Sequence, residues 1–270
     1  MRFTTIIAVP YDHGLKNTGA GAGPARILAA GADRLLAYRG APAEVRHIDM
    51  RDKKCRGLDA VVDIGRQVRV AVREARQQEM LPVILAGDCL TAIGILAGLE
   101  PDGTGVIWLD GHADFETSQA RALGAIDSMA LATAAGHCHE DLRGRIGLPS
   151  PIREHYIALV APRDMSDGER ARLAASRISI AAPEVPFPFD CAAEQIYLHV
   201  DLDCLAVEES PGVARPVAGG LAVEAAATLI RHIMATRPVA AVAFTHFRPD
   251  LDKQDKTLNA VLKLIGAAAS

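Results

Sequence analysis

Apolar runs and helix-like stretches alternate along the chain. The apolar, β-branched runs, which predict strands, are residues 3–9, 44–49, 81–86, 105–110, 155–161, 177–181, 195–201 and 239–245. Between most of them lie Ala- and Arg-rich stretches of helical period, such as residues 24–37, 59–78, 90–99, 223–235 and 258–268. Alternation of this kind predicts a parallel sheet with helices on both of its faces.

Two irregular segments interrupt this pattern. Residues 138–153 contain Pro149, Pro151 and two glycines, and they predict a surface loop; Pro183, Pro186 and Pro188 indicate another. No Pro/Gly/Ser linker, internal repeat or low-complexity segment divides the sequence. We therefore expect residues 1–270 to form a single domain.

Composition excludes several classes of protein. Hydrophobic residues make up 50% of the chain but aromatic residues only 4%, so the core must consist of Ala, Val, Leu and Ile, which suit parallel strands buried on both faces. The net charge of −4 and the pI of about 6.1 argue against a nucleic-acid-binding protein. No run of apolar residues is long enough to predict a membrane span, and the apolar start resembles a first strand more than a signal peptide.

The cysteines bear on the cellular compartment. Their number is odd, they are widely spaced, and none forms a C-x-x-C pair; they are Cys55, Cys89, Cys138, Cys191 and Cys204. A disulfide framework is therefore not expected, and a reducing compartment, the cytoplasm, fits this pattern.

The strongest chemical signal follows the strand that ends at residue 109. The sequence there is Asp110-Gly111-His112-Ala113-Asp114. On an extended backbone, side chains at alternate positions share a face, so Asp110, His112 and Asp114 should point the same way from the carboxyl end of a strand, where parallel sheets form their sites. Such ligands suit Mn²⁺, Fe²⁺ or Zn²⁺. The alternative is a polar turn whose side chains only form hydrogen bonds.

Two further strands end in polar motifs. The apolar run at 196–200 leads into Asp201 and Asp203, two like charges that need a nearby cation unless they are solvated or cap the next segment. The run at 82–86 leads through Asp88 to Cys89 at a predicted helix start, where a thiolate is favoured. Taken alone, Cys89 is better explained as a small buried apolar side chain, which is the commoner role of cysteine.

In this order the three motifs resemble those of the ureohydrolases, the family of arginase and agmatinase. The family patterns are Gly-Gly-Asp-His, Asp-Ala-His-x-Asp and Asp-x-Asp-x-x-Asp-Pro, and their counterparts begin at Ala86, Asp110 and Asp201. The resemblance extends to Gly21-Ala22-Gly23-Pro24, to Pro211-Gly212 and to residues 216–221, so it covers nearly the whole chain. It implies a three-layer α/β/α fold with a mostly parallel sheet of about eight strands.

The resemblance also implies two divalent metal ions, most often Mn²⁺, and hydrolysis of a C–N bond by a bridging hydroxide that Asp114 orients. One metal would be held by Cys89, Asp110, Asp114 and Asp201, and the other by Asp110, His112, Asp201 and Asp203. Cys89 stands where most members have histidine, and its softer sulfur should tilt the preference toward Zn²⁺ or Fe²⁺.

Other positions depart from the family around the substrate. Asp127 falls at the position of a histidine proton shuttle and is a candidate acid only if burial raises its pKa. His246 replaces the glutamate that clamps a guanidinium, so it is a candidate proton donor and substrate-binding residue for a hydroxyguanidine, amidine, formimino or amide group. Glu116 replaces an asparagine that helps to bind a carboxylate, and Thr117 is kept, which makes both substrate-binding candidates.

Some interpretations remain open. His13 is a candidate to line the pocket, and His199 lies one step deeper on the strand that leads to Asp201. A glycine-rich turn at residues 19–23 is superficially like a dinucleotide-binding turn, although its spacing from the first strand is wrong. The changed positions also allow a catalytically inactive relative with a regulatory or structural role. Because relatives form trimers or hexamers, a homo-oligomer is a further candidate assembly.

Overall fold

The computed structural model describes residues 3–37, 42–52, 54–117, 126–189 and 191–269. They form a parallel sheet with the strand order β4-β1-β5-β10-β9-β6-β7-β8, beside a two-stranded antiparallel ribbon of β2 and β3. The strands are β1 (Thr4–Val9), β2 (Tyr11–Asp12), β3 (Leu15–Lys16), β4 (Glu44–His47), β5 (Leu81–Ala86), β6 (Thr104–Leu109), β7 (Ile157–Val160), β8 (Ser179–Ala181), β9 (Gln195–Asp201) and β10 (Val239–Thr245). The eight predicted strands and the α/β class are therefore confirmed.

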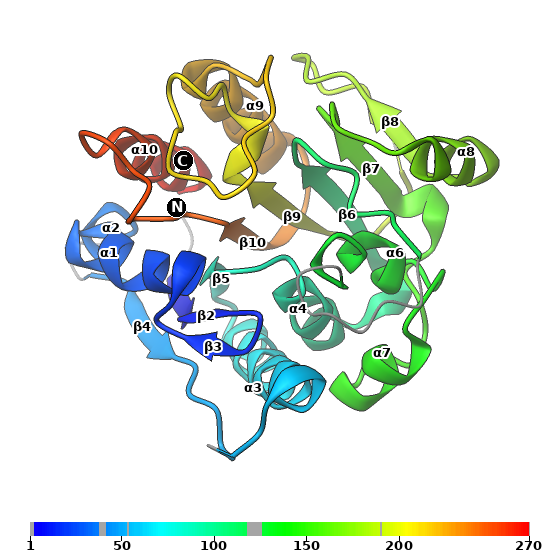
Figure 1. Ribbon diagram of the computed structural model, residues 1–270, viewed down its shortest axis with the longest axis horizontal. Helices are drawn as coiled ribbons and strands as arrows, with labels where there is room; N and C mark the ends of the chain where they lie inside the picture. The colour runs from blue at the N-terminus through cyan, green and yellow to red at the C-terminus, as the bar shows by residue number, and fades with distance from the viewer. Residues whose placement is uncertain (1–2, 38–41, 53, 118–125, 190, 270) are drawn as a thin grey trace.

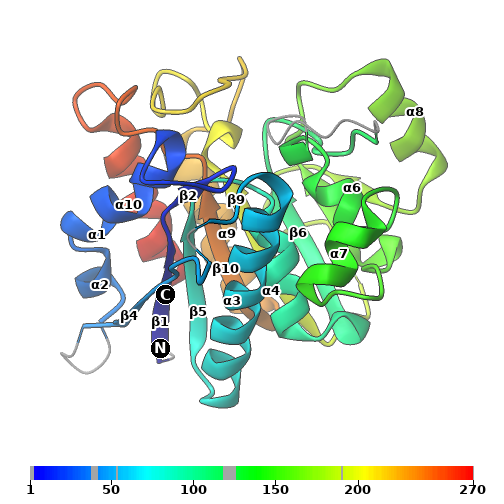
Figure 2. The ribbon, with the colours of Figure 1, turned by 60° about the horizontal axis from the view of Figure 1, so that its bottom comes forward.

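Helices cover both faces of the sheet (Figures 1 and 2). One face carries α1 (Gly23–Ala29), α2 (Ala32–Leu35), α9 (Val223–Thr236) and α10 (Lys256–Ala268), and the other carries α3 (Gly57–Gln77), α4 (Thr91–Leu99), α6 (Ala130–Ala134) and α7 (Glu140–Ile146). Helix α8 (Asp167–Ala175) lies beside β7 and β8. Short 3₁₀ turns occupy Gly19–Ala22, Pro101–Gly103, Glu154–Tyr156 and Leu202–Cys204.

The core consists of two apolar layers, one on each side of the sheet. Successive strand residues alternate between them: Ile7 and Ile84 belong to the layer under α3 and α4, whereas Ile6 and Val83 belong to the layer under α9 and α10. All four side chains are fully buried. This is why the strand sequences show continuous apolar runs instead of an apolar and polar alternation.

Two element predictions need correction. Residues 138–153 are not all loop, because α7 spans Glu140–Ile146 and buries Leu142 and Ile146, one helical turn apart, before Gly147 ends it with a φ of +108°. The predicted helix at 24–37 is divided into α1 and α2 at Gly31, whose φ is +93°. In the described parts of the chain, no helix is both long and apolar enough to cross a membrane.

Candidate metal centre

The polar motifs meet at the carboxyl ends of four neighbouring central strands, β5, β10, β9 and β6. The register sets their relative depth, because Trp108 of β6 pairs with His199 of β9, and Asp201 of β9 pairs with Thr245 of β10. Asp201 is the last residue of β9, and Asp110 directly follows the last residue of β6. The sheet therefore brings together side chains that are about a hundred residues apart in the sequence.

Close backbone packing holds the turn that carries Asp88 and Cys89. A Cβ at Gly87 would lie 2.2 Å from the carbonyl oxygen of Tyr11, so only glycine fits there. Asp88 accepts hydrogen bonds from the backbone N–H of His13 (2.8 Å) and from Thr91 (3.2 Å). The N–H of Cys89 donates to Asp127 Oδ1 at 3.0 Å. The thiol is thereby fixed over the ends of β9 and β10.

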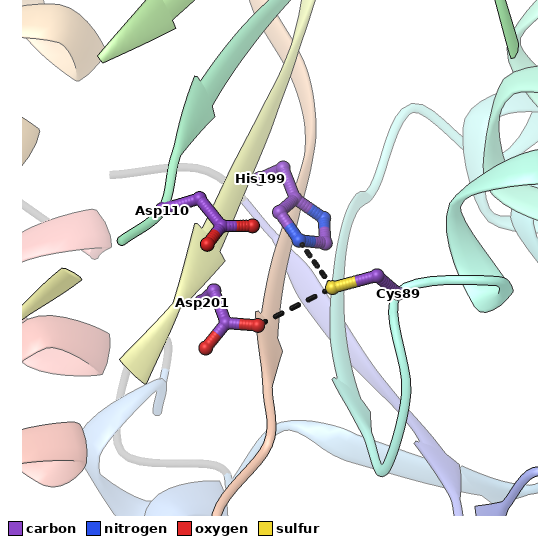
Figure 3. A group of neighbouring side chains, drawn as sticks. All are labelled: Cys89, Asp110, His199 and Asp201. Carbon is purple, nitrogen blue, oxygen red and sulfur yellow. Dashed lines mark hydrogen bonds between the residues drawn. The ribbon is translucent and has the colours of Figure 1, made fainter. Parts of the chain in front are cut away.

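A first group of potential ligands lies deepest (Figure 3). It comprises Cys89, Asp110, His199 and Asp201, all buried, and each offers one atom within 4.8 Å of the others. Cys89 Sγ lies 3.3 Å from Asp201 Oδ2 and 3.2 Å from His199 Nε2. The structure thus brings together three of the four residues predicted for one metal position, and it adds His199.

A second group shares Asp110 and lies nearer the surface. It comprises Asp110, His112 and Asp203, again with one atom each within 4.8 Å of the others. His112 Nδ1 is 2.8 Å from Asp203 Oδ2 and 3.6 Å from Asp110 Oδ1. The backbone N–H of Gly111 donates to Asp203 Oδ1 at 2.8 Å and orients that carboxylate. These are three of the four residues predicted for the other metal position.

Asp114 belongs to neither group but lies beside them. It is 3% exposed, and among the described residues its Oδ2 has no hydrogen-bond partner. Its φ of +49° is unusual for a residue other than glycine, and His246 and His13 share this feature with φ of +65° and +50°. Backbone strain of this kind is concentrated at functional sites. An unpaired buried carboxylate oxygen fits a site that binds a cation.

The electrostatics of the centre favour a bound cation. Burial raises the pKa of Asp110 well above its ordinary value, and Asp203, Asp114 and Asp201 raise it further. Burial likewise raises the pKa of Asp114, together with the charges of Asp127 and Asp201. So many carboxylates cannot all be ionised in a buried space without a compensating positive charge. The donor set and its charge therefore fit the divalent metal ions that the sequence predicts.

A histidine–aspartate chain adjoins the ligand groups. His246 is hydrogen-bonded through Nδ1 to Asp201 Oδ2, and its Nε2 lies 2.9 Å from Asp127 Oδ2. Burial alone would raise the pKa of Asp127, but the charges of His246 and His13 hold it well below its usual range. The condition for Asp127 to act as an acid is therefore not met, and this carboxylate instead holds the ring of His246.

The centre opens into a cleft of about 320 Å³. His13, predicted as a lining residue, does line it, as do Asp127, Asp203 and His246. The sequence analysis missed two arginines, Arg215 and Arg248, and a lone arginine in a loop gives no signal of its own. Arg248 makes two hydrogen bonds to Asp250, at 2.7 and 2.8 Å. The charge of Arg248 is therefore paired, and Arg215 adds a positive charge to the cleft wall.

The predicted substrate-binding residues Glu116 and Thr117 lie outside this cleft lining as described. Glu116 accepts hydrogen bonds from Ser166 and from Arg172, the latter at 2.8 Å. These contacts lower the pKa of Glu116, with Ser166 the larger cause. Its charge is thus already paired with an arginine. Because residues 118–125 are outside the described residues, the role of Glu116 and Thr117 in substrate binding stays a prediction.

Packing accounts for the glycines at 19–23. A Cβ at Gly21 would lie 2.9 Å from the backbone nitrogen of Asp12, and one at Gly23 would lie 2.7 Å from the carbonyl oxygen of Phe247. Asp49 lies after β4, where a dinucleotide-binding fold would place the acidic residue that binds the ribose, but here it accepts hydrogen bonds from Tyr11 (2.9 Å) and Lys16 (2.7 Å). These glycines allow the loop after β1 to pack on its neighbours.

Comparisons with known proteins agree with this geometry. A sequence profile described as the Arginase family matches residues 3–270. Arginase from Bacillus caldovelox is 28% identical, over 99% of this chain and 98% of that protein, and arginase from Bacillus subtilis is 26% identical, over 97% and 95%. A crystal structure of Bacillus subtilis arginase has a TM-score of 0.88 at 25% identity and covers 100% of this chain and 99% of that one.

Proposed function

The chain belongs to the arginase family of hydrolases, which act on C–N bonds other than peptide bonds, and from this premise we propose that it is a two-metal hydrolase of a small molecule. The bond cleaved belongs to a guanidino-like or related group: a hydroxyguanidine, amidine, formimino or amide. The observation that carries the proposal is the pair of ligand groups that share Asp110 at the ends of adjacent strands.

In this proposal the two metal positions share one ligand and differ in the others. Cys89, Asp110 and Asp201 would hold one ion, and Asp110, His112 and Asp203 would hold the other, so that Asp110 is shared by the two positions. When bound, two divalent ions supply Lewis acidity and activate water near neutral pH. Asp114, whose Oδ2 lacks a partner among the described residues, accepts a hydrogen bond from the attacking water and orients it.

The departing nitrogen needs a proton, and His246 is positioned to supply it. Its ring lines the cleft, and Asp127 holds it at Nε2 from 2.9 Å. Burial alone would lower the pKa of His246, but the charges of Asp201 and Asp127 raise it well above its ordinary value, so the ring carries the proton that a general acid needs. In this arrangement Asp127 is a positioning residue that orients His246.

The cleft favours a substrate other than a plain guanidinium cation. His246 stands where the family resemblance places a clamping carboxylate, and Arg215 lines the same cleft. No hydrogen bond or ion pair of Arg215 is found among the described residues, so its guanidinium is available to a ligand. We therefore propose a substrate with a neutral or weakly basic reacting group and an anionic end that meets Arg215.

Metal content and activity together test the proposed function. The purified protein should bind about two divalent ions per chain and hydrolyse at least one compound in a panel of guanidino, hydroxyguanidino, amidino, formimino and amide compounds. Asp110→Asn should remove both metal binding and activity, by more than about 100-fold, because Asp110 is shared. Asp164→Asn is the matched control, since Asp164 is 70% exposed near His112 and lies in neither ligand group.

The outcome that contradicts the proposal is equally definite. Metal content like that of the wild type in Asp110→Asn would refute the shared ligand. A wild-type protein that binds no divalent ion would refute the hydrolase itself and would leave an inactive relative as the remaining explanation.

A further inference from the structure

His199 is a buried histidine for which the family motifs supply no role. It lies on β9 two residues before Asp201, so both side chains leave the same face of the strand. Its ring is fully buried and stacks on Trp108, with centroids 3.6 Å apart and planes 10° apart. Its Nε2 faces the thiol of Cys89 at 3.2 Å (Figure 3).

We propose that His199 is a ligand of the deep metal position, with Cys89, Asp110 and Asp201, and that this donor set selects Zn²⁺ over Mn²⁺. The inference rests on the proposed metal centre and adds to it a ligand outside the family motifs. A thiolate, an imidazole and carboxylates form a donor set typical of zinc, whereas Mn²⁺ prefers oxygen.

The distances suit a compact tetrahedral site. With ordinary zinc bond lengths, two ligand atoms of a tetrahedron lie about 3.3 to 3.6 Å apart. Cys89 Sγ is 3.2 Å from His199 Nε2 and 3.3 Å from Asp201 Oδ2, so these edges need little adjustment. All four ligand atoms lie within 4.8 Å of one another.

The surroundings of His199 are those of a metal ligand. Tyr197 Oη lies 2.7 Å from Nδ1; when Nδ1–H donates to it, the lone pair of Nε2 faces the cluster. Trp108 fixes the plane of the ring and donates through Nε1 to Asp110 Oδ2 at 2.9 Å, and Thr245 donates to Asp201 Oδ2 at 3.2 Å. Hydrogen bonds that orient ligands in this way are the usual second layer of a metal site.

A purely structural role is the competing explanation. In that case His199 would be a buried ring that forms hydrogen bonds with Tyr197 and the Cys89 thiol and packs on Trp108. Such a role predicts that substitution of His199 reduces stability but leaves the relative affinity for zinc and manganese unchanged.

Metal titrations separate the two explanations. Metal-free protein is titrated with Zn²⁺ and with Mn²⁺ in competition with a chromophoric chelator. His199→Phe keeps a ring to stack on Trp108, and His199→Gln keeps a polar group. In both variants we expect the dissociation constant of the tighter-binding Zn²⁺ ion to rise on the order of 100-fold. The dissociation constant for Mn²⁺ should rise by less than about tenfold. His232→Gln is the control, because His232 lies on α9, outside the ligand groups, and accepts a hydrogen bond from the backbone N–H of Phe187.

X-ray absorption of the zinc-loaded protein gives a readout that does not depend on the folding of a His199 variant. In His112→Ala, which lacks the imidazole of the other position, one equivalent of Zn²⁺ should show one sulfur and one imidazole in its coordination shell. Absence of imidazole scattering would overturn the inference. The inference would also be overturned if both His199 variants kept the zinc affinity of the wild type while Cys89→Ser weakened it. That result would leave the proposed function intact. A wild-type protein that binds no divalent ion overturns both.

Discussion

A chain of charged side chains links the loop after β1 to the metal-ligand residues. His13 contacts Asp12 through Nδ1 at 2.8 Å and Asp127 through Nε2 at 3.4 Å, and Asp127 holds His246. Burial alone would lower the pKa of His13, but its contacts with the carboxylates of Asp12 and Asp127 raise it to about 10. The imidazolium of His13 therefore compensates carboxylates that the metals do not reach.

This raised pKa predicts how stability depends on pH. A group whose pKa is higher in the folded state stabilises the protein fully below its unfolded pKa, here about 6.5, and the contribution is lost as pH rises toward about 10. His13→Gln should therefore cost roughly 2 kcal/mol at pH 6, a figure reduced for partial exposure, and almost nothing near pH 10. Urea unfolding of both proteins across this range measures the difference.

The control for this pH dependence is a histidine away from the cleft. His155 packs on the ring of Tyr156, with centroids 4.4 Å apart, and His155→Gln, which leaves the contacts of His13 in place, is the comparison variant. A His13→Gln profile parallel to that of the wild type would show that the contacts of His13 with Asp12 and Asp127 contribute nothing to stability.

At the level of single residues, the sequence predicts those site residues that strand parity or a motif identifies. Cys89, Asp110, His112, Asp201 and Asp203 do gather as the strand-end patterns indicate. Parity fails where the backbone is no longer extended: β6 ends at Leu109, and Asp114, with a φ of +49°, lies outside both ligand groups. The same parity rule places His199 on the face of β9 that carries Asp201, one step deeper, because residues two apart on a strand share a face.

At the level of elements, the turn between β5 and α4 determines where Cys89 lies. Because a Cβ at Gly87 would come within 2.2 Å of the Tyr11 carbonyl oxygen, Gly87→Ala must displace either this turn or the loop after β1. We expect a loss of about 2 kcal/mol in the free energy of unfolding, typical of overpacking, and weaker zinc binding. Thermal unfolding and chelator competition measure the two effects.

Gly144 offers a matched control within the same molecule. It lies inside α7, and no atom comes within 4 Å of a Cβ built there. Gly144→Ala should stabilise the protein by about 0.5 to 1 kcal/mol, because alanine loses less backbone entropy in a helix. Equal effects of the two substitutions would contradict the packing argument.

The helices show why element boundaries were harder to predict than strands. Fully buried strands appear as uninterrupted apolar runs, which the sequence displays directly. Helix α7 was missed because the nearby Pro149 and Pro151 indicated a loop, although Leu142 and Ile146 have helical spacing. The pattern at 24–37 predicts one helix, because Gly31 alone does not reveal whether a helix is broken or tolerates a glycine.

For the whole molecule, strand order is what the local patterns cannot supply. Strands β5 and β6 follow one another in the sequence, but β10 and β9 lie between them in the sheet. The ligands of β5, β6 and β9 become neighbours only because these late strands insert at the centre. The family resemblance implied that these residues meet and that the sheet has about eight strands, and hydrophobic periodicity indicated a parallel sheet, but neither gave the strand order.

Because the ligands come from strands at the centre of the sheet, metal binding should stabilise the whole molecule. Each ion at a hundred times its dissociation constant adds about 2.7 kcal/mol, and each kcal/mol shifts the unfolding temperature of a chain of this size by roughly 2 to 4 °C. Removing both ions with a chelator should therefore lower the midpoint by roughly 10 °C or more, as measured by calorimetry.

Asp110→Asn should reverse the effect of metal on stability. In the metal-free wild type, Asp110 is a buried carboxyl group whose pKa is raised by burial and by Asp203, Asp114 and Asp201, so its ionised form is destabilising, increasingly so as pH rises. Asparagine removes that charge, and the metal-free variant should unfold at a higher temperature than the metal-free wild type at pH 8. With metal in excess, the order should invert, because only the wild type gains binding energy. If the wild type unfolds at the higher temperature both with and without metal, then the ionised carboxylate of Asp110 does not destabilise the metal-free protein. That result would contradict the proposal that repulsion among these carboxylates is compensated by a bound cation.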